Sequence, residues 1–421
     1  MRDTDFVVPG VGHAELMAAL APHGRVEDLV VAGQSVGVRL LPADREVRRL
    51  APAGIEFAPP RVERSTGPGR HDFEIVADAS IPLEQDMERR DFTINAIAKR
   101  LETGEILDPL HGRSDLEHGV LRTTSPTSFR DDPLRIVRGL RFVSELGLDP
   151  DEETLAQMRE WAPQVRLVSA ERIGGGLAAD GQGELSKLLL GPHPAKALRL
   201  ARDTGVLTTI LPEFEPVVGH DTGTERQGMS VDEHVFATVQ NGADLGLPLE
   251  VRLALLLHDI GKPIPDREVS HADAAARLSR AALSRLRYPA RLVADVVRVV
   301  AGHAFHVERD FAGEPARRFL ARHGERIARF LFQHKRADLL AKKIESWELP
   351  ALEGMEQAVL REREHPYRVS DLAIDGNDLL AAGIPQGPQI GQVLRELLDE
   401  VLTDPARNDP DWLRERAREL M

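Results

Sequence analysis

The sequence lacks cysteine entirely, and it has few aromatic residues and no long apolar run. Without cysteine, the chain of 421 residues can form no disulfide, no thiolate zinc site and no cysteine nucleophile. No window approaches 18 uninterrupted apolar residues, and the most apolar helical stretch, at 292–304, contains Arg298 and His303. The first ten residues carry charges where a signal peptide needs an apolar core. We therefore expect a cytoplasmic protein without a membrane partner.

Charge is abundant but unevenly distributed. Lysine and arginine total 54 against 68 aspartate and glutamate residues, which gives a formal net charge of −14. Seven of the basic residues are lysines, which leaves 47 arginines. The net charge argues against a general nucleic-acid binder, but arginine clusters at 122–141 and 277–336 provide local basic surface. The length and the 42% apolar share indicate a globular protein of two or three domains.

Hydrophobic periodicity divides the chain into a short mixed segment and a long helical one. Strands are expected at 3–9, 27–33, 35–42, 55–63 and 72–78, with one helix at 12–20. After about residue 125, strand signals disappear and the apolar residues keep the helical period almost to the end. The predicted fold class is therefore α+β, with a small mixed-sheet head and an all-helical remainder. The expected domains are a head, a neck, a body and a tail, at 1–122, 123–215, 216–345 and 346–421.

Two aspartates lie close together at the start of the chain. Asp3 and Asp5 are two residues apart on an expected strand, and the strand period of two puts both carboxylates on one face. Glu56, on a neighbouring expected strand, is the candidate third carboxylate. Such a set suits the two Mg²⁺ ions of phosphoryl transfer, where one activates the attacking hydroxyl and the other neutralises a triphosphate. Asp-x-Asp alone is a weak signal, because most occurrences are surface turns.

Residues 86–98 concentrate charge immediately before an apolar run. Arg89, Arg90, Asp91 and Asn95 are candidates for binding the phosphates and ribose hydroxyls of a nucleotide. The alternative is an ordinary helix start, with Asp91 near the N-cap. Composition alone favours this structural alternative, because capping explains many such charges.

Residues 129–142 carry a row of acidic and basic side chains on one expected helix, namely Asp131, Asp132, Arg135, Arg138 and Arg141. Asp132 and Arg135 are three apart, so they would project together, either as a surface ion pair or as a reader of nucleobases. An arginine donates toward O2 and N3 of cytosine while an aspartate accepts from its amino group, and adenine offers an equivalent edge. Guanine and uracil mismatch this pair, so it can select C and A without a template.

These segments closely resemble the class II tRNA nucleotidyltransferases (CCA-adding enzymes) and the related bacterial poly(A) polymerases. The resemblance rests on RRDFTINAIA, LDPLHGRSDLEHGVLR, FRDDPLRIVRGLRF, and VSAERI followed by ELSKLLLG. It implies that Asp3, Asp5 and Glu56 are the Mg²⁺ ligands. It implies a ribose motif at Arg89, Arg90, Asp91 and Asn95. The residues that it implies for base reading or nucleotide binding are Asp131, Asp132, Arg135 and Arg138. Aspartate stands at 131 where the family has glutamate, a change we expect to be tolerated because the reading falls to Asp132 and Arg135.

A second group of candidate ligands lies in the helical region. His258 and Asp259 follow an apolar run, where polar groups are costly unless something satisfies them. With two more residues they resemble the metal-binding set of the HD phosphohydrolases, which is here His234, His258, Asp259 and Asp338. Two further histidines are candidates for a second metal position, namely His271 and His303. Imidazole and carboxylate ligands suit Mn²⁺, Ni²⁺ or Mg²⁺ better than a structural zinc.

The resemblance implies template-independent addition of C, C and A to tRNA 3′ ends from CTP and ATP. For the HD domain it implies a phosphatase or 2′,3′-cyclic phosphodiesterase activity. Three alternatives remain open: a poly(A) polymerase, a partial adder of CC or A, and a metal-dependent phosphohydrolase whose head only binds RNA. The sequence does not indicate an oligomeric state.

One family element is not found in the printed sequence. The family carries a Gly-Gly-x-x-x-Arg-Asp segment upstream of Asp-x-Asp, and here Asp3 is the third residue. We therefore expect either a start codon assigned too far downstream or a head with an incomplete nucleotide pocket and weak transferase activity.

Overall fold

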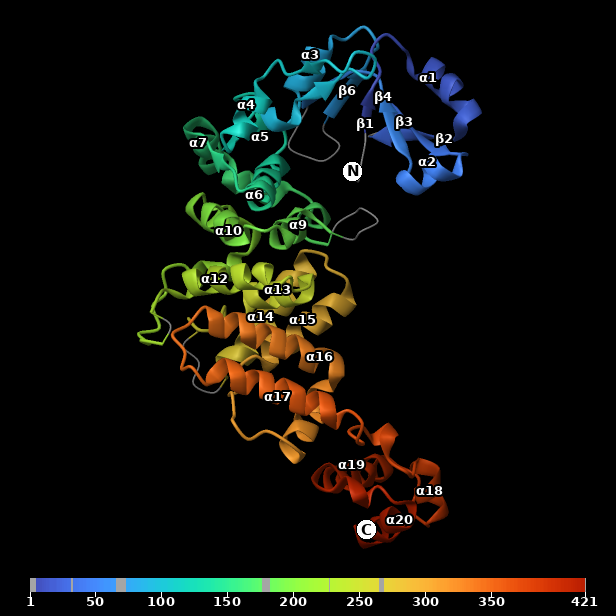
Figure 1. The fold of residues 1–421 in the computed structure, drawn as a ribbon, viewed down its shortest axis with the longest axis vertical. Coiled ribbons are helices and arrows are strands. Elements are labelled where there is room, and N and C mark those ends of the chain that lie inside the picture. Colours follow the sequence, from blue (N-terminus) through green and yellow to red (C-terminus); the bar gives the residue numbers. More distant parts are fainter. Residues whose placement is uncertain are drawn as a thin grey trace. The chain divides into compact units, whose positions relative to one another are not determined.

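The computed structural model divides the chain into two compact units (Figure 1). The first unit consists of Met1–Glu215 with Arg285–Tyr288, and the second of Pro216–Ser284 with Pro289–Met421. The residues that the structure describes are 5–31, 33–65, 73–175, 182–226, 228–264 and 269–420. None of the helices in these ranges is both long enough and apolar enough to cross a membrane.

The first unit begins with a small mixed sheet, as the sequence predicts. Its strands are β1 (Asp5–Val7), β2 (Gly24–Val31), β3 (Gln34–Pro42) and β4 (Ile55–Ala58), in the order β1-β4-β3-β2. Strands β1 and β4 are parallel, and the other pairs are antiparallel. Helix α1 (His13–Leu20) packs on β3, whose alternating apolar residues are buried. The period of two therefore leaves the other face of the sheet for polar side chains.

Shorter elements follow the sheet. They are α2 (Arg45–Leu50), β5 (Arg61–Ser65), β6 (Phe73–Ala77), α3 (Leu83–Glu88), the 3-10 turn η2 (Thr93–Asn95), β7 (Ala98–Lys99), β8 (Ile106–Leu107), α4 (Gly112–Glu117) and β9 (Val120–Leu121). The single strand expected at 55–63 is wrong. Pro59 and Pro60 lack backbone donors, so β4 ends before them and β5 starts after them in a separate two-stranded sheet with β6.

The helical neck completes the first unit. Its helices are α5 (Ser128–Asp131), α6 (Leu134–Leu146), α7 (Glu152–Trp161), α8 (Ala170–Ile173), α9 (Glu184–Leu190), α10 (Pro194–Asp203) and α11 (Val206–Ile210). Fully buried side chains join this region to the head: Phe92, Leu121, Phe129, Ile136, Leu140 and Met158. The expectation of no strands after residue 125 is wrong in one place, because β10 (Asp149–Pro150) pairs with β9.

The single helix expected over 129–142 is also wrong. It is two helices, because a residue before proline is disfavoured in the helical region. Asp132, which precedes Pro133, has φ −144° and ψ 103°, so α5 ends there and α6 begins just beyond the proline.

The second unit is helical throughout its described residues. Its body contains α12 (Val231–Asp244), α13 (Leu249–Leu257), α14 (His271–Arg285), α15 (Ala290–Gly302), α16 (Glu314–Leu340) and α17 (Glu348–Glu362), and its tail α18 (Gly376–Ala381), α19 (Pro388–Thr403) and α20 (Pro410–Glu419). Residues 251–257 of α13 are all buried, and α13 packs against α12, α15 and α16. A helix that is apolar on every side belongs at the centre of a bundle, and α13 occupies that place.

Candidate functional site

A cavity of about 680 Å³ in the first unit contains most of the predicted head residues. The sheet contributes Asp5 and Glu56, which are register partners in the parallel pair β1–β4, so their side chains project from the same face. Glu56 accepts from Arg39 Nη2 at 2.5 Å, so a neighbouring strand offsets part of its charge. Carboxylate oxygens from adjacent strands are the donor set that Mg²⁺ prefers, and these two residues fit such an ion. Asp3 lies outside the described residues.

The predicted ribose segment forms the next wall of the cavity. Arg89, Arg90, Asp91 and Asn95 all line it. Asp86 lines the cavity as well; it is 1% exposed and accepts from Arg89 Nη2 at 2.8 Å and from the Arg61 backbone N–H at 3.1 Å. Asp86 therefore orients an arginine of the cavity wall. The sequence analysis missed Asp86, although a carboxylate three and four residues before two arginines is a recognisable helical signal.

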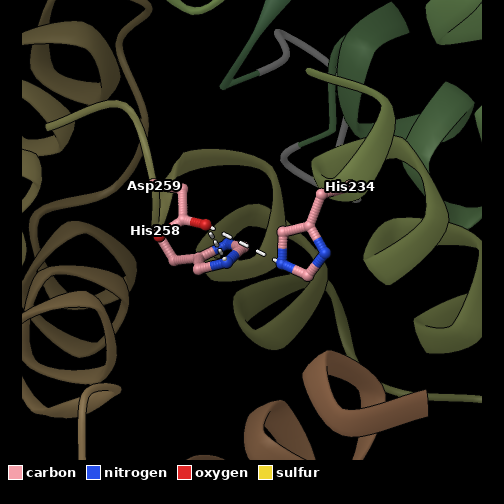
Figure 2. Close-up of side chains that lie close together, drawn as sticks. All are labelled: His234, His258 and Asp259. Atoms are coloured by element: carbon pink, nitrogen blue, oxygen red, sulfur yellow. Dashed lines mark ion pairs between the residues drawn. The ribbon is translucent and has the colours of Figure 1, made fainter. Parts of the chain in front are cut away.

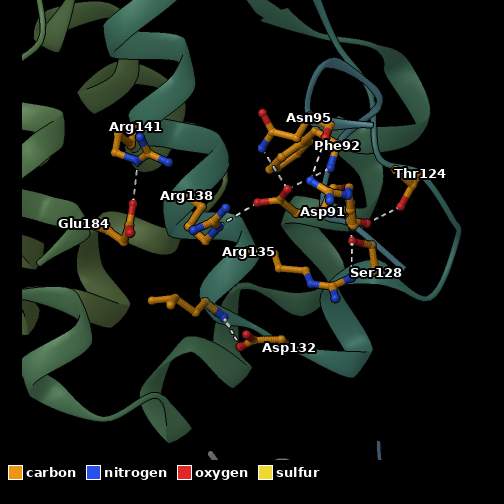
Figure 3. A network of polar contacts seen from close by, with 12 residues as sticks. Asp91, Phe92, Asn95, Thr124, Ser128, Asp132, Arg135, Arg138, Arg141 and Glu184 are labelled. Carbon is orange, nitrogen blue, oxygen red and sulfur yellow. Dashed lines mark hydrogen bonds and ion pairs between the residues drawn. The ribbon is translucent and has the colours of Figure 1, made fainter. Parts of the chain in front are cut away.

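Asp91 joins the head to the neck. Its carboxylate is 6% exposed and accepts from Arg138 Nε at 2.6 Å and from Asn95 Nδ2 at 2.9 Å (Figure 3). Burial alone would raise the pKa of Asp91, but the Arg138 guanidinium and the Asn95 amide outweigh burial and lower it. The alternative of a helix starting at Asp91 is wrong, because the chain makes only the 3-10 turn Thr93–Asn95 before β7.

The start of α6 supplies the wall that the sequence predicts to read bases. Asp132 and Arg135 both line the cavity, but they do not pair through their side chains. Asp132 Oδ2 accepts from Arg172 Nη2 at 3.2 Å. Arg135 donates to Ser128 Oγ at 3.1 Å (Figure 3) and to the Arg89 carbonyl at 2.8 Å. Arg172 lies in α8 and was not singled out from the sequence, since no spacing rule connects it to Asp132.

Asp131 lies apart from the other members of its motif. It accepts from Thr127 Oγ1 at 2.7 Å and is not among the described residues that line the cavity. Arg141 of α6 lies one turn after Arg138, and its Nε donates to Glu184 of α9 at 2.6 Å (Figure 3). Helix α6 is therefore fixed on both sides by buried ion pairs, one to the head through Arg138 and one to the neck through Arg141.

The second unit brings the predicted HD residues together. His234 of α12, His258 and Asp259 just after α13, and Asp338 of α16 are each at most 3% exposed. His234 Nε2 lies 3.7 Å from Asp259 Oδ2, and His258 Nε2 lies 3.1 Å from the same oxygen (Figure 2). His234 Nε2 also lies 3.0 Å from Asp338 Oδ1. Four side chains that are far apart in the sequence thus converge on one buried point.

The hydrogen bonds around this point favour a bound cation in addition to Lys262, whose Nζ lies 2.7 Å from Asp259 Oδ2. His258 Nδ1 lies 2.8 Å from the Leu255 carbonyl, which assigns the ring proton to Nδ1. In this tautomer, Nε2 is an acceptor, and it faces a carboxylate oxygen at 3.1 Å with no hydrogen-bond partner among the described residues. Two acceptors in such proximity repel each other unless a cation lies between them. The residues therefore fit a divalent metal ion held by imidazole and carboxylate.

A second ligand set shares Asp259 with the first. It consists of Asp259, His271 and His303, whose ligand atoms all lie within 4.8 Å of one another. His303 Nδ1 lies 2.6 Å from the Val300 carbonyl, which leaves Nε2 toward the carboxylate. Burial lowers the pKa of His303 to about 3, so the ring is neutral and able to bind metal at neutral pH. The arrangement can accommodate two ions with one bridging aspartate.

The sequence analysis did not identify His334 as a neighbour of this site. His334 is fully buried, and its ring lies 4.9 Å from that of His258 at 80°. Neither of its ring nitrogens has a hydrogen-bond partner among the described residues. Its position one helical turn before Asp338 was the available signal, because residues four apart on a helix share a face.

Comparison with protein families divides the chain into three matched regions. The family described as "Poly A polymerase head domain" matches residues 2–122. The family described as "Probable RNA and SrmB- binding site of polymerase A" matches 147–217, and "HD domain" matches 231–352.

Characterised relatives cover most of the chain. The "Multifunctional CCA protein" of Variovorax paradoxus is 31% identical over 428 residues, which cover 94% of this chain and 93% of the relative. The protein of the same name from Neisseria gonorrhoeae is 35% identical over 266 residues, which cover 62% of this chain and 58% of that relative. The alignment with the Neisseria protein thus spans little more than half of its length.

Solved structures share the fold. The Bacillus stearothermophilus CCA-adding enzyme, solved in complex with CTP, aligns with a TM-score of 0.69 at 24% identity, covering 100% of this chain and 90% of that one. The Thermotoga maritima CCA-adding enzyme, solved with a tRNA, aligns with a TM-score of 0.56 at 20% identity, covering 100% and 87%. At these identities the similarity concerns the fold.

Proposed function

The chain belongs to the family of the multifunctional CCA proteins, and from this premise we propose that it adds C, C and A to tRNA 3′ ends from CTP and ATP. The observation that carries the proposal is the cavity of the first unit, which is lined both by carboxylates of the sheet and by Asp132 and Arg135. A nucleotide needs both, a metal-binding end for the triphosphate and a hydrogen-bonding end for the base. The proposed divisions of the chain remain head, neck, HD body and tail, ending at 122, 215, 345 and 421.

The metal-binding end is assigned to the sheet. We propose that Asp5 and Glu56, with Asp3 predicted beside them, hold Mg²⁺. When bound, Mg²⁺ favours ionisation of the attacking 3′-hydroxyl and offsets the charge of the triphosphate. The arginines held by Asp86 and Asp91 line the same cavity and would bind the phosphates and ribose from the side.

The base-reading end is assigned to the start of α6. Arg135 is held by Ser128 and the Arg89 carbonyl, which use two of its five N–H donors, and the others remain for a base. Arg172 holds one oxygen of Asp132, and the other accepts from the Leu134 backbone N–H at 3.0 Å. Both groups are thus oriented before a nucleotide arrives, as recognition without a template requires.

The HD clusters support a second activity. We propose that the second unit is a metal-dependent phosphatase or 2′,3′-cyclic phosphodiesterase, with His234, His258, Asp259 and Asp338 as ligands of one ion. His271 and His303 would join Asp259 around a second. The site is built of hard and borderline donors, for which Mn²⁺, Ni²⁺ and Mg²⁺ are the candidate ions.

Transferase activity is tested with a tRNA that lacks CCA, supplied with CTP and ATP together and singly, and with products resolved to one nucleotide. Sequential C, C and A additions support the proposal. Continued A addition would indicate a poly(A) polymerase, and termination after CC, or addition of A alone, a partial adder. Asp5→Asn should lower addition more than a hundredfold, since one metal ligand is worth several kcal/mol in the transition state. Near-normal addition by Asp5→Asn would refute the metal assignment.

The chain offers a matched pair for the base-reading assignment. Asp132→Asn should raise misincorporation of UTP or GTP relative to CTP by about tenfold, the equivalent of one net hydrogen bond. Asp131→Asn alters the adjacent carboxylate, which does not line the cavity, and should leave selectivity unchanged. Equal effects of the two variants would show that Asp132 does not read the base.

The HD activity is tested with 2′,3′-cyclic AMP and each of the three metals. Asp259→Asn should abolish hydrolysis and leave CCA addition intact, because the two sites lie in separate units. His234→Gln removes another proposed ligand of the same ion. Its control is His365→Gln, because His365 is a half-exposed histidine outside both ligand sets. Absence of hydrolysis by the wild-type protein with every metal would refute the proposed second activity.

A further inference from the structure

A second cavity, of about 390 Å³, adjoins the HD metal site within the second unit. Asp338, a proposed metal ligand, lies in its wall, so the cavity and the first ligand set share one carboxylate. The described lining residues include three cations, two carboxylates and a tryptophan: Arg226, Lys335, Lys342, Asp338, Glu348 and Trp347. A cavity of this size accommodates a nucleotide-sized ligand.

The three cations of the cavity wall differ in how closely a carboxylate pairs with each of them. Arg226 is paired with Glu348, and Lys342 Nζ lies 2.7 Å from Asp338. Lys335 is the third cation, and its ion-pair partner among the described residues is the same Asp338, at 4.0 Å. The cavity wall thus carries one more positive than negative charge, and the excess is located at Lys335.

Lys335 is also withdrawn from water. Its side chain is 11% exposed, and Nζ lies 4.9 Å from the centre of the Phe305 ring. A buried ammonium attracts an anion more strongly than an exposed one, because neither water nor salt screens it well. If Asp338 binds a metal ion, its charge offsets Lys335 and Lys342 less, and the wall becomes more attractive to an anion.

Trp347 provides a surface for a planar group in the same wall. One contact of its ring is already defined, since the Arg309 guanidinium lies 4.7 Å from the ring centre. Indole rings stack on nucleobases irrespective of base identity. An anion site and an indole in a single cavity are complementary to a phosphate ester that carries a base.

We propose that this cavity binds the substrate of the HD site, a nucleoside phosphate, with Lys335 and Lys342 holding its phosphate and Trp347 its base. The proposal rests on the proposed HD function, and it adds to that function the residues that determine its specificity for a nucleotide. Lys335 and Trp347 act in binding, so their loss should raise KM and leave kcat nearly unchanged.

The kinetic test compares 2′,3′-cyclic AMP with glycerol phosphate, which has no base. Lys335→Gln should raise KM for both about tenfold or more with kcat within threefold, and Lys335→Arg should partly restore it. Trp347→Leu should raise KM for the nucleotide about tenfold, as expected for one lost stacking contact, but not for glycerol phosphate. Lys343→Gln is the matched control, since Lys343 is exposed and outside the lining. If Lys335→Gln folds poorly, Lys342→Gln, at a 20% exposed position, tests the same phosphate site. Unchanged KM in these lysine and Trp347 variants would overturn the proposal.

A binding test separates this proposal from the HD activity. In a Trp161→Phe/Trp412→Phe background, Trp347 is the only tryptophan, so its fluorescence reports on this cavity. AMP should quench it in the presence or absence of Mn²⁺, adenosine should quench it far more weakly, and Lys335→Gln should weaken the AMP effect about tenfold. Quenching without hydrolysis would retain the cavity and reject the proposed activity. Hydrolysis without quenching, or equal quenching by AMP and adenosine, would reject the cavity.

Discussion

The buried pair between Asp91 and Arg138 makes the sharpest prediction about the first unit. Asp91 is 6% exposed, whereas the Arg138 side chain is 35% exposed. Breaking a fully buried pair costs about 3–5 kcal/mol, and water around Arg138 reduces this cost. We expect Asp91→Asn to lower the free energy of unfolding of this unit by about 2 kcal/mol, and Arg138→Met by about 3 kcal/mol because it leaves the more buried charge unpaired.

The double variant distinguishes a coupled pair from two independent packing effects. Either single change already breaks the ion pair, so Asp91→Asn/Arg138→Met should cost about 3 kcal/mol rather than 5. Trp161 is the tryptophan of the first unit, so a Trp347→Phe/Trp412→Phe background allows urea unfolding of this unit to be followed by fluorescence. Arg130→Met, at a 59% exposed position, is the control and should cost less than about 0.5 kcal/mol. Additive effects of the two single changes, within about 0.5 kcal/mol, would refute the coupling.

Three further predictions concern the second unit. Arg317 is 7% exposed and donates to the Leu402 carbonyl at 2.7 Å, at the end of α19. Arg317→Met should therefore lower the free energy of unfolding of this unit by about 2–4 kcal/mol, measured by urea unfolding with Trp412 fluorescence. A change below about 1 kcal/mol would exclude a structural role for Arg317. After metal ions are removed by a chelator, this unit should become less stable as the pH falls below about 6.5. The pKa of His303 is about 3 in the folded protein, so between these pH values only the unfolded chain binds the proton, which costs about 1.4 kcal/mol of stability per pH unit. Equal melting temperatures at pH 7 and pH 5 would contradict this prediction. Mn²⁺ at a hundred times its Kd should restore about 2.7 kcal/mol, and His234→Gln should weaken this effect; a metal-independent melting temperature in the wild-type protein would contradict it.

The family and the fold class could be predicted from the sequence, and both are confirmed. The head strands were predictable because alternation of apolar residues is a local property, and β3 shows it in its buried Val36, Val38 and Leu40. His258 and Asp259 could be singled out because polar groups directly after the apolar α13 require a compensating partner, whereas His234 and Asp338 were found only through the resemblance to the HD phosphohydrolases. Their roles, like those of the head residues, stay predictions.

The errors have local physical causes that the motifs concealed. Residues 129–142 were expected to lie on one helix, from which Asp132 and Arg135 would project together. Pro133 instead separates α5 from α6, and Asp132 turns toward Arg172. This break fits the proposed function better than a continuous helix. An extended backbone at Asp132 lets its carboxylate and the Arg135 side chain enter the cavity without neutralising each other.

What the sequence could not indicate is which charged residues are buried. Residues 333–343 in and beyond α16 have the composition of an exposed helix, yet His334, Lys335 and Asp338 are all less than 10% exposed. Burial of such groups opposes folding unless each has a partner. Asp338 has His234 and two lysines, but the His334 nitrogens have none among the described residues, and Lys335 shares its carboxylate with Lys342. Packing does not explain a charged helix face held in this way at the centre of a bundle, whereas the proposed binding of metal ions and a phosphate would.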